Sequence, residues 1–198
     1  MKRSLALLLM AGLVLPLAAQ KMKMRSGSFS ALKGEKSVNL QFTYDKMMVG
    51  KYAEADYLEK KAKEYDEKEP GRGDSFKSAW VADRVARFEP KFEELFNDGG
   101  TLSGSRDNAD AKYTFIVNTD FTEPGYNIGI SKMPASINAT IRLVEKASGN
   151  ELGAMLVVGV PGSQFGGYDY DTGSRLAESY AKLGKELRKY IDKNIFGK

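Results

Sequence analysis

The order of strand-like and helix-like hydrophobic patterns along this chain limits its fold more than any other feature. Apolar residues repeat every second position in the first kind of pattern and every three or four positions in the second. Residues 36–44 read KSVNLQFTY, with apolar residues at every second position, as in a strand with one buried face. Further strand patterns lie at 112–122, 135–145 and 151–160, and helical patterns at 51–69, 75–97 and 173–194. This order predicts a two-layer α+β fold, in which a four-stranded mixed sheet carries helices mainly on one face.

Connection lengths predict the strand directions. Helices join the strands at 36–44 and 112–122, so these two should be parallel with a right-handed crossover if they share a sheet. The last three strands should form an antiparallel meander, because the turn KASGN (146–150) between the last two has hairpin chemistry.

The helical patterns differ in the width of their apolar stripes. The pattern at 51–69 has a thin stripe and is expected at the periphery, whereas that at 173–194 is strongly amphipathic. The heaviest stripe lies in 75–97 and predicts core positions at Phe76, Trp80, Val81, Val85, Phe88, Phe92, Leu95 and Phe96. Pro90 interrupts it, which predicts a kink or two consecutive helices.

The first residues have the layout of a secretory signal peptide. Lys2 and Arg3 precede an apolar run that ends in Ala18 and Ala19, and this run is too short to span a bilayer. We expect removal of residues 1–19, a loose amino-terminal tail at 20–35 and a single domain at 36–198. The protein should be exported, either periplasmic or secreted, without a transmembrane segment in the mature chain.

Missing residue types exclude several kinds of chemistry. The chain has no cysteine, so a lipid anchor on cysteine and disulfides are excluded, and it has no histidine. Nucleophilic schemes that need histidine and zinc sites built from histidine or cysteine are therefore impossible. No phosphate or dinucleotide loop is present, and no cofactor or metal is expected. The net charge of +4 includes Lys2 and Arg3 of the leader, and the remaining +2 gives no indication of a nucleic-acid partner.

The predicted topology gathers three loops at one edge of the sheet. The first, second and fourth strands point the same way, so the loops at 45–50, 123–133 and 161–171 follow their carboxyl ends. We expect a ligand or partner at this edge, which would collect Asp45, Glu123, Tyr126, Asn127, Tyr168, Asp169, Tyr170 and Asp171.

The loop FGGYDYDTGSR (165–175) admits several interpretations. Its acidic residues resemble the start of a calcium loop, but glycine falls one position early and Tyr180 stands where a glutamate ligand is needed. Asp169 and Asp171 could instead form an acid/base pair for a glycoside, with neighbouring tyrosines as stacking faces. The plainer interpretation is a solvated turn in which Asp171 or Thr172 caps the last helix.

The segment GRGDS (71–75) contains the adhesion tripeptide Arg72-Gly73-Asp74. Adhesion would require these residues on an exposed loop tip with the Asp74 carboxylate accessible. The alternative is a tight turn between helices, in which Asp74 or Ser75 caps the following helix.

The second half of the chain also carries a family resemblance. The run DAKYTFIVNTDF, the loop EPGYNIG, a hairpin and the segment GGYDYDTGSRLAESYAKLGKEL are similar to small exported proteins of Gram-negative bacteria that have no assigned activity. The element order more distantly resembles the α+β domains of the curli secretion lipoprotein and of the amino-terminal part of TolB. The resemblance covers about half of the chain and implies assembly and protein contacts rather than catalysis.

These observations favour a non-catalytic binding domain in the bacterial envelope or outside the cell. Its partner would be a protein or another envelope component, and the sequence does not indicate an oligomeric state. The alternative is a carbohydrate-binding or carboxylate-based glycoside-active protein that uses the loop at 165–171.

Overall fold

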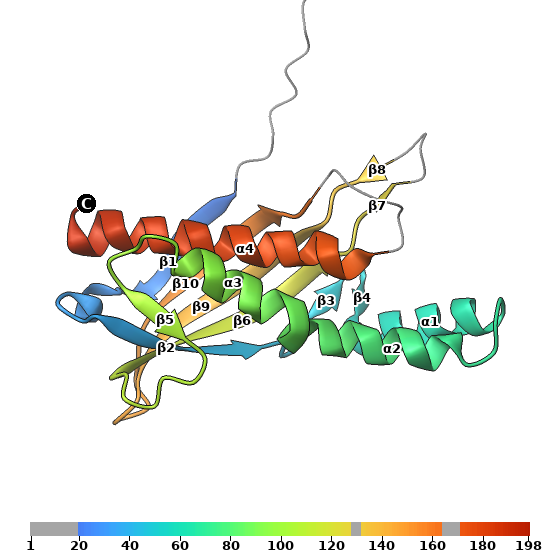
Figure 1. Ribbon diagram of the computed structural model, residues 1–198, viewed down its shortest axis with the longest axis horizontal. Helices are drawn as coiled ribbons and strands as arrows, with labels where there is room; N and C mark the ends of the chain where they lie inside the picture. Colours follow the sequence, from blue (N-terminus) through green and yellow to red (C-terminus); the bar gives the residue numbers. More distant parts are fainter. Residues whose placement is uncertain (1–19, 128–131, 164–170) are drawn as a thin grey trace, which may run out of the picture.

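The computed structural model describes residues 20–127, 132–163 and 171–198 (Figure 1). The expected signal peptide lies outside these residues. The fold is α+β, but the prediction of a four-stranded sheet is wrong, since the main sheet has eight strands in the order β1-β10-β9-β6-β2-β5, with β3 paired to β4 and β6. The strands are β1 (Lys21–Gly27), β2 (Ser37–Thr43), β3 (Met48–Val49), β4 (Tyr52–Ala53), β5 (Ser103–Ser105), β6 (Tyr113–Glu123), β9 (Ser136–Glu145) and β10 (Glu151–Pro161).

Strand β1 lies in the segment that was expected to be a loose tail. It pairs antiparallel with β10, with Met22 opposite Val157 and Met24 opposite Met155. Both methionines pack against the core, while Lys21 and Lys23 alternate with them and are exposed. Strand β1 therefore has one buried face, and it lies at the edge of the sheet, where lysines discourage pairing with another chain.

The predicted directions of the long strands are confirmed. Strand β2 is parallel to β6, and β6, β9 and β10 form an antiparallel meander. Alternate side chains of these strands form the buried face, which includes Phe115, Val117, Ile141, Leu143 and Met155. A separate two-stranded hairpin, β7 (Tyr126–Asn127) and β8 (Lys132–Met133), follows β6.

Helices α3 (Glu89–Phe96) and α4 (Thr172–Ile191) pack against each other over one face of the sheet, while α1 (Glu54–Asp66) and α2 (Arg72–Asp83) form a hairpin beyond its end (Figure 1). Short helical segments complete the fold: η1 (Ser30–Leu32), η2 (Arg84–Phe88) and η3 (Asp192–Phe196), of which η2 and η3 are π-helical. Among the described residues, no helix combines the length and apolar character needed to cross a bilayer.

The π-helical segment η2 explains a second correction. Pro90 lacks a backbone N–H and crowds the preceding turn. The helix predicted at 75–97 is therefore interrupted by η2, which separates α2 from α3. The wider π turn changes the phase of the apolar stripe. Trp80, Phe88 and Phe92 are buried as predicted, but Val81 and Val85 are 49% and 66% exposed, so their assignment to the core is wrong.

Helix α4 is attached to the sheet by close packing and one buried polar contact. Gly184 faces the backbone of Phe92 at the crossing of α3 and α4, where an added Cβ would overlap the Phe92 carbonyl. The ring of Tyr180 stacks on Phe88 with centroids 4.8 Å apart, and its hydroxyl lies 2.7 Å from the Thr119 hydroxyl of β6. These contacts fix the middle of α4 against α3 and over β6.

Candidate functional site

The described parts of the three predicted loops lie at one edge of the sheet. The amide of Gly50 donates to the Thr122 carbonyl at 2.9 Å, which places the first loop beside the end of β6. The amide of Gly162 donates to the Ala135 carbonyl at 2.7 Å, and the guanidinium of Arg175 donates to the Pro124 carbonyl at 3.4 Å. Helix α4 therefore begins beside the corner between β6 and β7.

The predicted site residues have different places at this edge. The Asp45 amide donates to the Asn118 side chain, and the Glu123 carboxylate accepts from the Gly125 amide at 3.1 Å. Tyr126 pairs with Met133 across the β7–β8 hairpin, and Asn127 is the second residue of β7. The predicted residues Tyr168, Asp169 and Tyr170 lie outside the described residues.

Asp171 caps α4, in agreement with one of the sequence interpretations. Its carboxylate accepts from the Ser174 amide at 2.9 Å and from the Ser174 hydroxyl at 2.6 Å. The Arg87 guanidinium donates to the same carboxylate at 2.6 Å. Partial burial works to raise the pKa of Asp171, but the Ser174 hydrogen bonds and the Arg87 charge outweigh it and lower the pKa. Asp171 is therefore an ionised structural carboxylate at neutral pH.

A pocket of about 290 Å³, called the α4 pocket below, opens between this cap and the α1–α2 hairpin. Four of its eleven lining residues are aromatic, and the rings of Tyr65, Phe76 and Trp80 form one cluster with centroids 5.1 and 6.1 Å apart. The pocket is lined by Tyr65, Phe76, Ala79, Trp80, Asp83, Arg87, Phe88, Asp171, Thr172, Gly173 and Leu176.

Charged groups form one rim of the α4 pocket. Arg87 bridges two acids, with Nε 3.0 Å from Asp83 and Nη1 2.6 Å from Asp171. Burial raises the pKa of Asp83, partly offset by the positive charge of Arg87. Gly173 brings the start of α4 against Asp83, because any Cβ at this position would overlap the Asp83 carboxylate. The rim therefore joins α4 to α2 and η2 through ion pairs, and these require the close approach of the two segments that Gly173 permits.

Trp80 is held by a second ion pair behind the pocket. Its indole Nε1 donates to the Glu54 carboxylate at 2.6 Å, and the same oxygen accepts from Arg84. The Arg84 guanidinium lies 4.1 Å from the ring centroid of Tyr44, a cation–π distance. The aromatic wall is thus preorganised by polar contacts between α1, α2 and η2.

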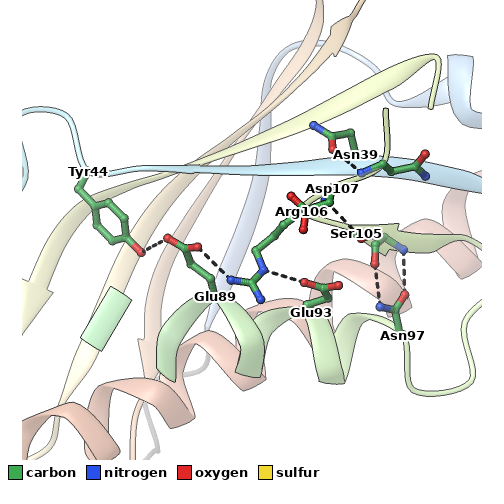
Figure 2. A network of polar contacts seen from close by, with 10 residues as sticks. Asn39, Tyr44, Glu89, Glu93, Asn97, Ser105, Arg106 and Asp107 are labelled. Atoms are coloured by element: carbon green, nitrogen blue, oxygen red, sulfur yellow. Dashed lines mark hydrogen bonds and ion pairs between the residues drawn. The ribbon is translucent and has the colours of Figure 1, made fainter. Parts of the chain in front are cut away.

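Figure 2 shows the polar contacts that continue from Tyr44 along the first turns of α3. The Tyr44 hydroxyl donates to Glu89 at 3.4 Å, and Arg106 joins Glu89 to Glu93 with contacts of 3.3 and 2.8 Å. Burial, then the neighbouring Tyr180 and Glu89, strongly raise the pKa of Tyr44, so its phenol stays protonated and remains a donor. Because every charged member has a partner, this network serves as a brace between β2, α3 and the segment after β5.

The adhesion tripeptide is helical. Helix α2 begins at Arg72, three residues before the predicted start, and Gly71 precedes it in the left-handed region with a φ of 85°. Gly73 is buried and donates its amide to Asp66 at 2.8 Å. Asp74 lies in the first turn and is not the cap, so neither the expected cap nor the expected loop tip is found.

Sequence reasoning missed the residues of α2 and η2 that complete the pocket. Trp80 and Phe88 were assigned to the core only, and Asp83 and Arg87 attracted no attention. A usable signal was present, because Asp83 and Arg87 stand four residues apart beside the only tryptophan of the chain. Within the described residues, no group of three or more potential metal-ligating side chains occurs.

Comparisons with known proteins give likenesses in fold only. No protein-family model and no curated protein matches the chain. Solved structures that match include a PelC dodecamer from Paraburkholderia phytofirmans, with 13% identity over 85% of this chain and 98% of that chain and a TM-score of 0.42. A putative neuraminyllactose-binding hemagglutinin homologue from Helicobacter pylori matches with 13% identity over 83% and 89% of the two chains and a TM-score of 0.37.

Protein XCC0632 from Xanthomonas campestris, of the DUF330 family model, also matches, with 11% identity over 78% of this chain and 84% of that chain and a TM-score of 0.36. The likeness to the curli secretion lipoprotein and to TolB is not shown by these comparisons. At such identities and scores, the matches supply no argument about function, and the site has to be interpreted from its own residues.

Proposed function

We propose that this protein is an exported, non-catalytic binding domain that receives a bulky side chain of a partner protein in the α4 pocket. The observation that carries the proposal is the pocket itself, with an aromatic wall of Tyr65, Phe76 and Trp80 and a charged rim at Arg87. Apolar pockets with a few convergent polar groups are the usual form of binding sites. Its volume suits one large side chain rather than an extended ligand.

The β7–β8 hairpin beside the start of α4 supports a protein partner. Tyr126 and Met133 form a cross-strand pair, and they are 41% and 45% exposed. Arg175 of α4 contacts the Pro124 and Gly125 carbonyls at the base of this hairpin and also the Thr172 hydroxyl. Tyrosine, methionine and arginine are enriched in protein interfaces. The hairpin and the pocket therefore offer neighbouring contact points along the start of α4.

The chemistry of the cap supports a non-catalytic role over the glycoside-active alternative. A general acid for glycoside cleavage needs a raised pKa, whereas the pKa of Asp171 is lowered and its oxygens already accept three hydrogen bonds. A pure carbohydrate-binding role would need broad exposed ring faces, but Trp80 and Phe88 are buried. Export is supported by the leader pattern at residues 1–19.

Neighbouring positions on α2 provide a matched test. Ala79 and Ser78 are both exposed, but only Ala79 lines the α4 pocket. A photoreactive phenylalanine analogue at position 79 should give a discrete crosslinked protein species in cells that export the chain, and the same analogue at position 78 should not. Ala79→Trp should fill the pocket and weaken the interaction, while Ser78→Trp should leave it intact.

Trp80 supplies an independent readout, because it is the only tryptophan. Addition of the crosslinked partner should change the fluorescence of Trp80 in the parent protein and in Ser78→Trp. It should not change it in Ala79→Trp. In both variants the emission of the introduced tryptophan is subtracted first. Equal crosslinking at both positions, or crosslinks to glycan alone, would show that the α4 pocket does not hold a partner protein.

A further inference from the structure

A second pocket lies at the opposite end of α4 and has a different chemical character. Its volume is about 450 Å³, and we call it the basic pocket. It lies where the segment after α3 passes the carboxy-terminal part of α4 (Figure 1). The basic pocket is lined by Gly99, Gly100, Thr101, Arg188, Lys189, Asp192, Lys193 and Lys198, so four of its eight residues are cationic and one is acidic.

Arg188 is the central group of the basic pocket. Its side-chain stem passes beneath Gly100, where an added Cβ would lie only 2.8 Å from the Arg188 Cγ. The Nε atom of Arg188 is buried and has no hydrogen-bond partner. No carboxylate in the described part of the chain forms an ion pair with this guanidinium. A guanidinium held in place without a countercharge is costly unless an anion or water completes its bonds.

The acidic residue of the basic pocket offsets only part of its positive charge. The Asp192 carboxylate accepts from the Thr101 amide at 2.9 Å and holds the turn after α3 in place, and it opposes the three cations Arg188, Lys193 and Lys198 with a single negative charge. Lys189 is paired with Glu186 at 2.7 Å on the exposed surface. Lys193 and Lys198 are exposed, and within the described residues their ammonium groups form no hydrogen bond or ion pair. Arg188, Lys193 and Lys198 therefore leave excess positive charge around one cavity.

Compensation of the helix dipole does not account for this arrangement. Basic residues near a helix carboxyl end are favourable because the last carbonyls carry partial negative charge. That effect needs no cavity, no glycine opposite the arginine stem and no anchored turn. Here Gly100 leaves space for Arg188 and Asp192 fixes the turn, so the walls of the basic pocket come from two elements that are far apart in the chain.

We propose that the basic pocket binds a phosphate group. A tetrahedral oxyanion would accept hydrogen bonds from the planar guanidinium of Arg188, and Lys193 and Lys198 would add charge at the rim. The phosphate could be carried by an anionic lipid headgroup or be a free phosphate, since the same donors serve both. This site is independent of the α4 pocket and goes beyond the proposed function.

Two variants of equal charge change test the proposal. Arg188→Gln removes the central donor, and Lys185→Gln removes an exposed cation of α4 that lies outside the basic pocket. Inorganic phosphate is titrated into the purified 15N-labelled protein at constant ionic strength, with chloride as the control anion. The Thr101 amide signal should shift with phosphate and not with chloride, and Arg188→Gln should weaken binding at least about five-fold.

A vesicle arm separates the two sources of phosphate. A lipid headgroup is identified if the protein cosediments with phosphatidylglycerol vesicles but not with phosphatidylcholine vesicles. This cosedimentation should be lost in Arg188→Gln and kept in Lys185→Gln. Phosphate titration without vesicle binding identifies a free phosphate. If Arg188→Gln melts at a lower temperature than the parent, Lys193→Gln takes its place, because Lys193 is exposed.

The proposal would be overturned if the protein bound neither inorganic phosphate nor phosphatidylglycerol vesicles. Equal loss of binding in Arg188→Gln and Lys185→Gln would overturn it as well, since it would show attraction to the general charge of α4. A shift of the Thr101 amide signal of equal size with chloride would also overturn the proposal, since it would show no preference for phosphate.

Discussion

Loss of the Tyr180 hydroxyl should destabilise the contact between α4 and the sheet. Tyr180 and Thr119 are both buried, and their hydroxyl oxygens are 2.7 Å apart. Burial raises the pKa of Tyr180, although its hydrogen bond to Thr119 opposes the shift, so the phenol is protonated over the whole neutral range. Tyr180→Phe keeps the stack on Phe88 and removes only the oxygen.

The expected magnitude follows from what remains behind. In Tyr180→Phe, the Thr119 hydroxyl is left in an apolar environment without this partner, which costs about 1–3 kcal/mol. Thr119→Val removes the same hydrogen bond from the Tyr180 hydroxyl, but Tyr44 still lies beside this hydroxyl, so the cost should be smaller. Removing both hydroxyls should cost much less than the sum, because no buried polar group then lacks its partner. The coupling energy of the double-variant cycle should be about 1–2 kcal/mol.

Urea denaturation of the four proteins, followed by far-ultraviolet circular dichroism, measures this cycle. The slope of the free energy with urea should be unchanged, so that differences in midpoint report differences in stability. If Tyr180→Phe is as stable as the parent, or if the two single effects add without coupling, the hydroxyl contact does not hold α4 in the way described here.

Three further predictions concern the same packing. Gly184→Ala should destabilise by about 1–3 kcal/mol in thermal unfolding in spite of the better helix propensity of alanine, because the Cβ would overlap the backbone of Phe92 and force α3 and α4 apart. Glu54→Gln should cost about 2 kcal/mol, less than the loss of a fully buried pair, because it leaves Arg84, whose side chain is 18% exposed, without its carboxylate; a red shift of the tryptophan emission should accompany it. Asp171→Asn should lower stability at neutral pH. Because the folded pKa of Asp171 is depressed, its contribution is complete above the unfolded value of about 4 and is lost as the pH falls through the folded pKa. Stability curves of parent and variant should therefore converge at acid pH, and a constant gap would contradict the ion pair.

The long strands could be predicted because their pattern repeats over many residues. Strands β2, β6, β9 and β10 each have at least seven residues, enough for period two to be visible. Strands β3 and β4 have two residues each and β5 reads Ser-Gly-Ser, so no period exists to be recognised. Strand β1 has seven residues, but its only large apolar side chains are Met22 and Met24 among charged residues, so it did not stand out as a strand. For these reasons the width of the sheet was underestimated.

Of the candidate site, only what is local could be predicted from the sequence. Asp171 has one of its expected roles, because the cap of a helix is a local property. Its partner Arg87 lies 84 residues earlier, and their contact depends on the π-helical turn before Pro90. A local sequence pattern could not predict this contact, because the direction in which Arg87 points depends on the π-helical turn that precedes Pro90.

The uncovered face of the sheet gives a reason why binding should concentrate at the ends of α4. Four polar side chains of this face, from β2, β6 and β9, form a chain of hydrogen bonds. Thr43 donates to Asn118 at 2.8 Å, Asn118 donates to Asp120 at 2.7 Å, and Thr140 donates to the other Asp120 oxygen at 2.6 Å. Each of these groups already has a partner, so a ligand there would have to replace existing hydrogen bonds. The α4 pocket instead offers apolar rings, and the basic pocket offers a guanidinium that has no partner among the described residues. Binding at either pocket would add contacts without breaking a hydrogen bond between these residues.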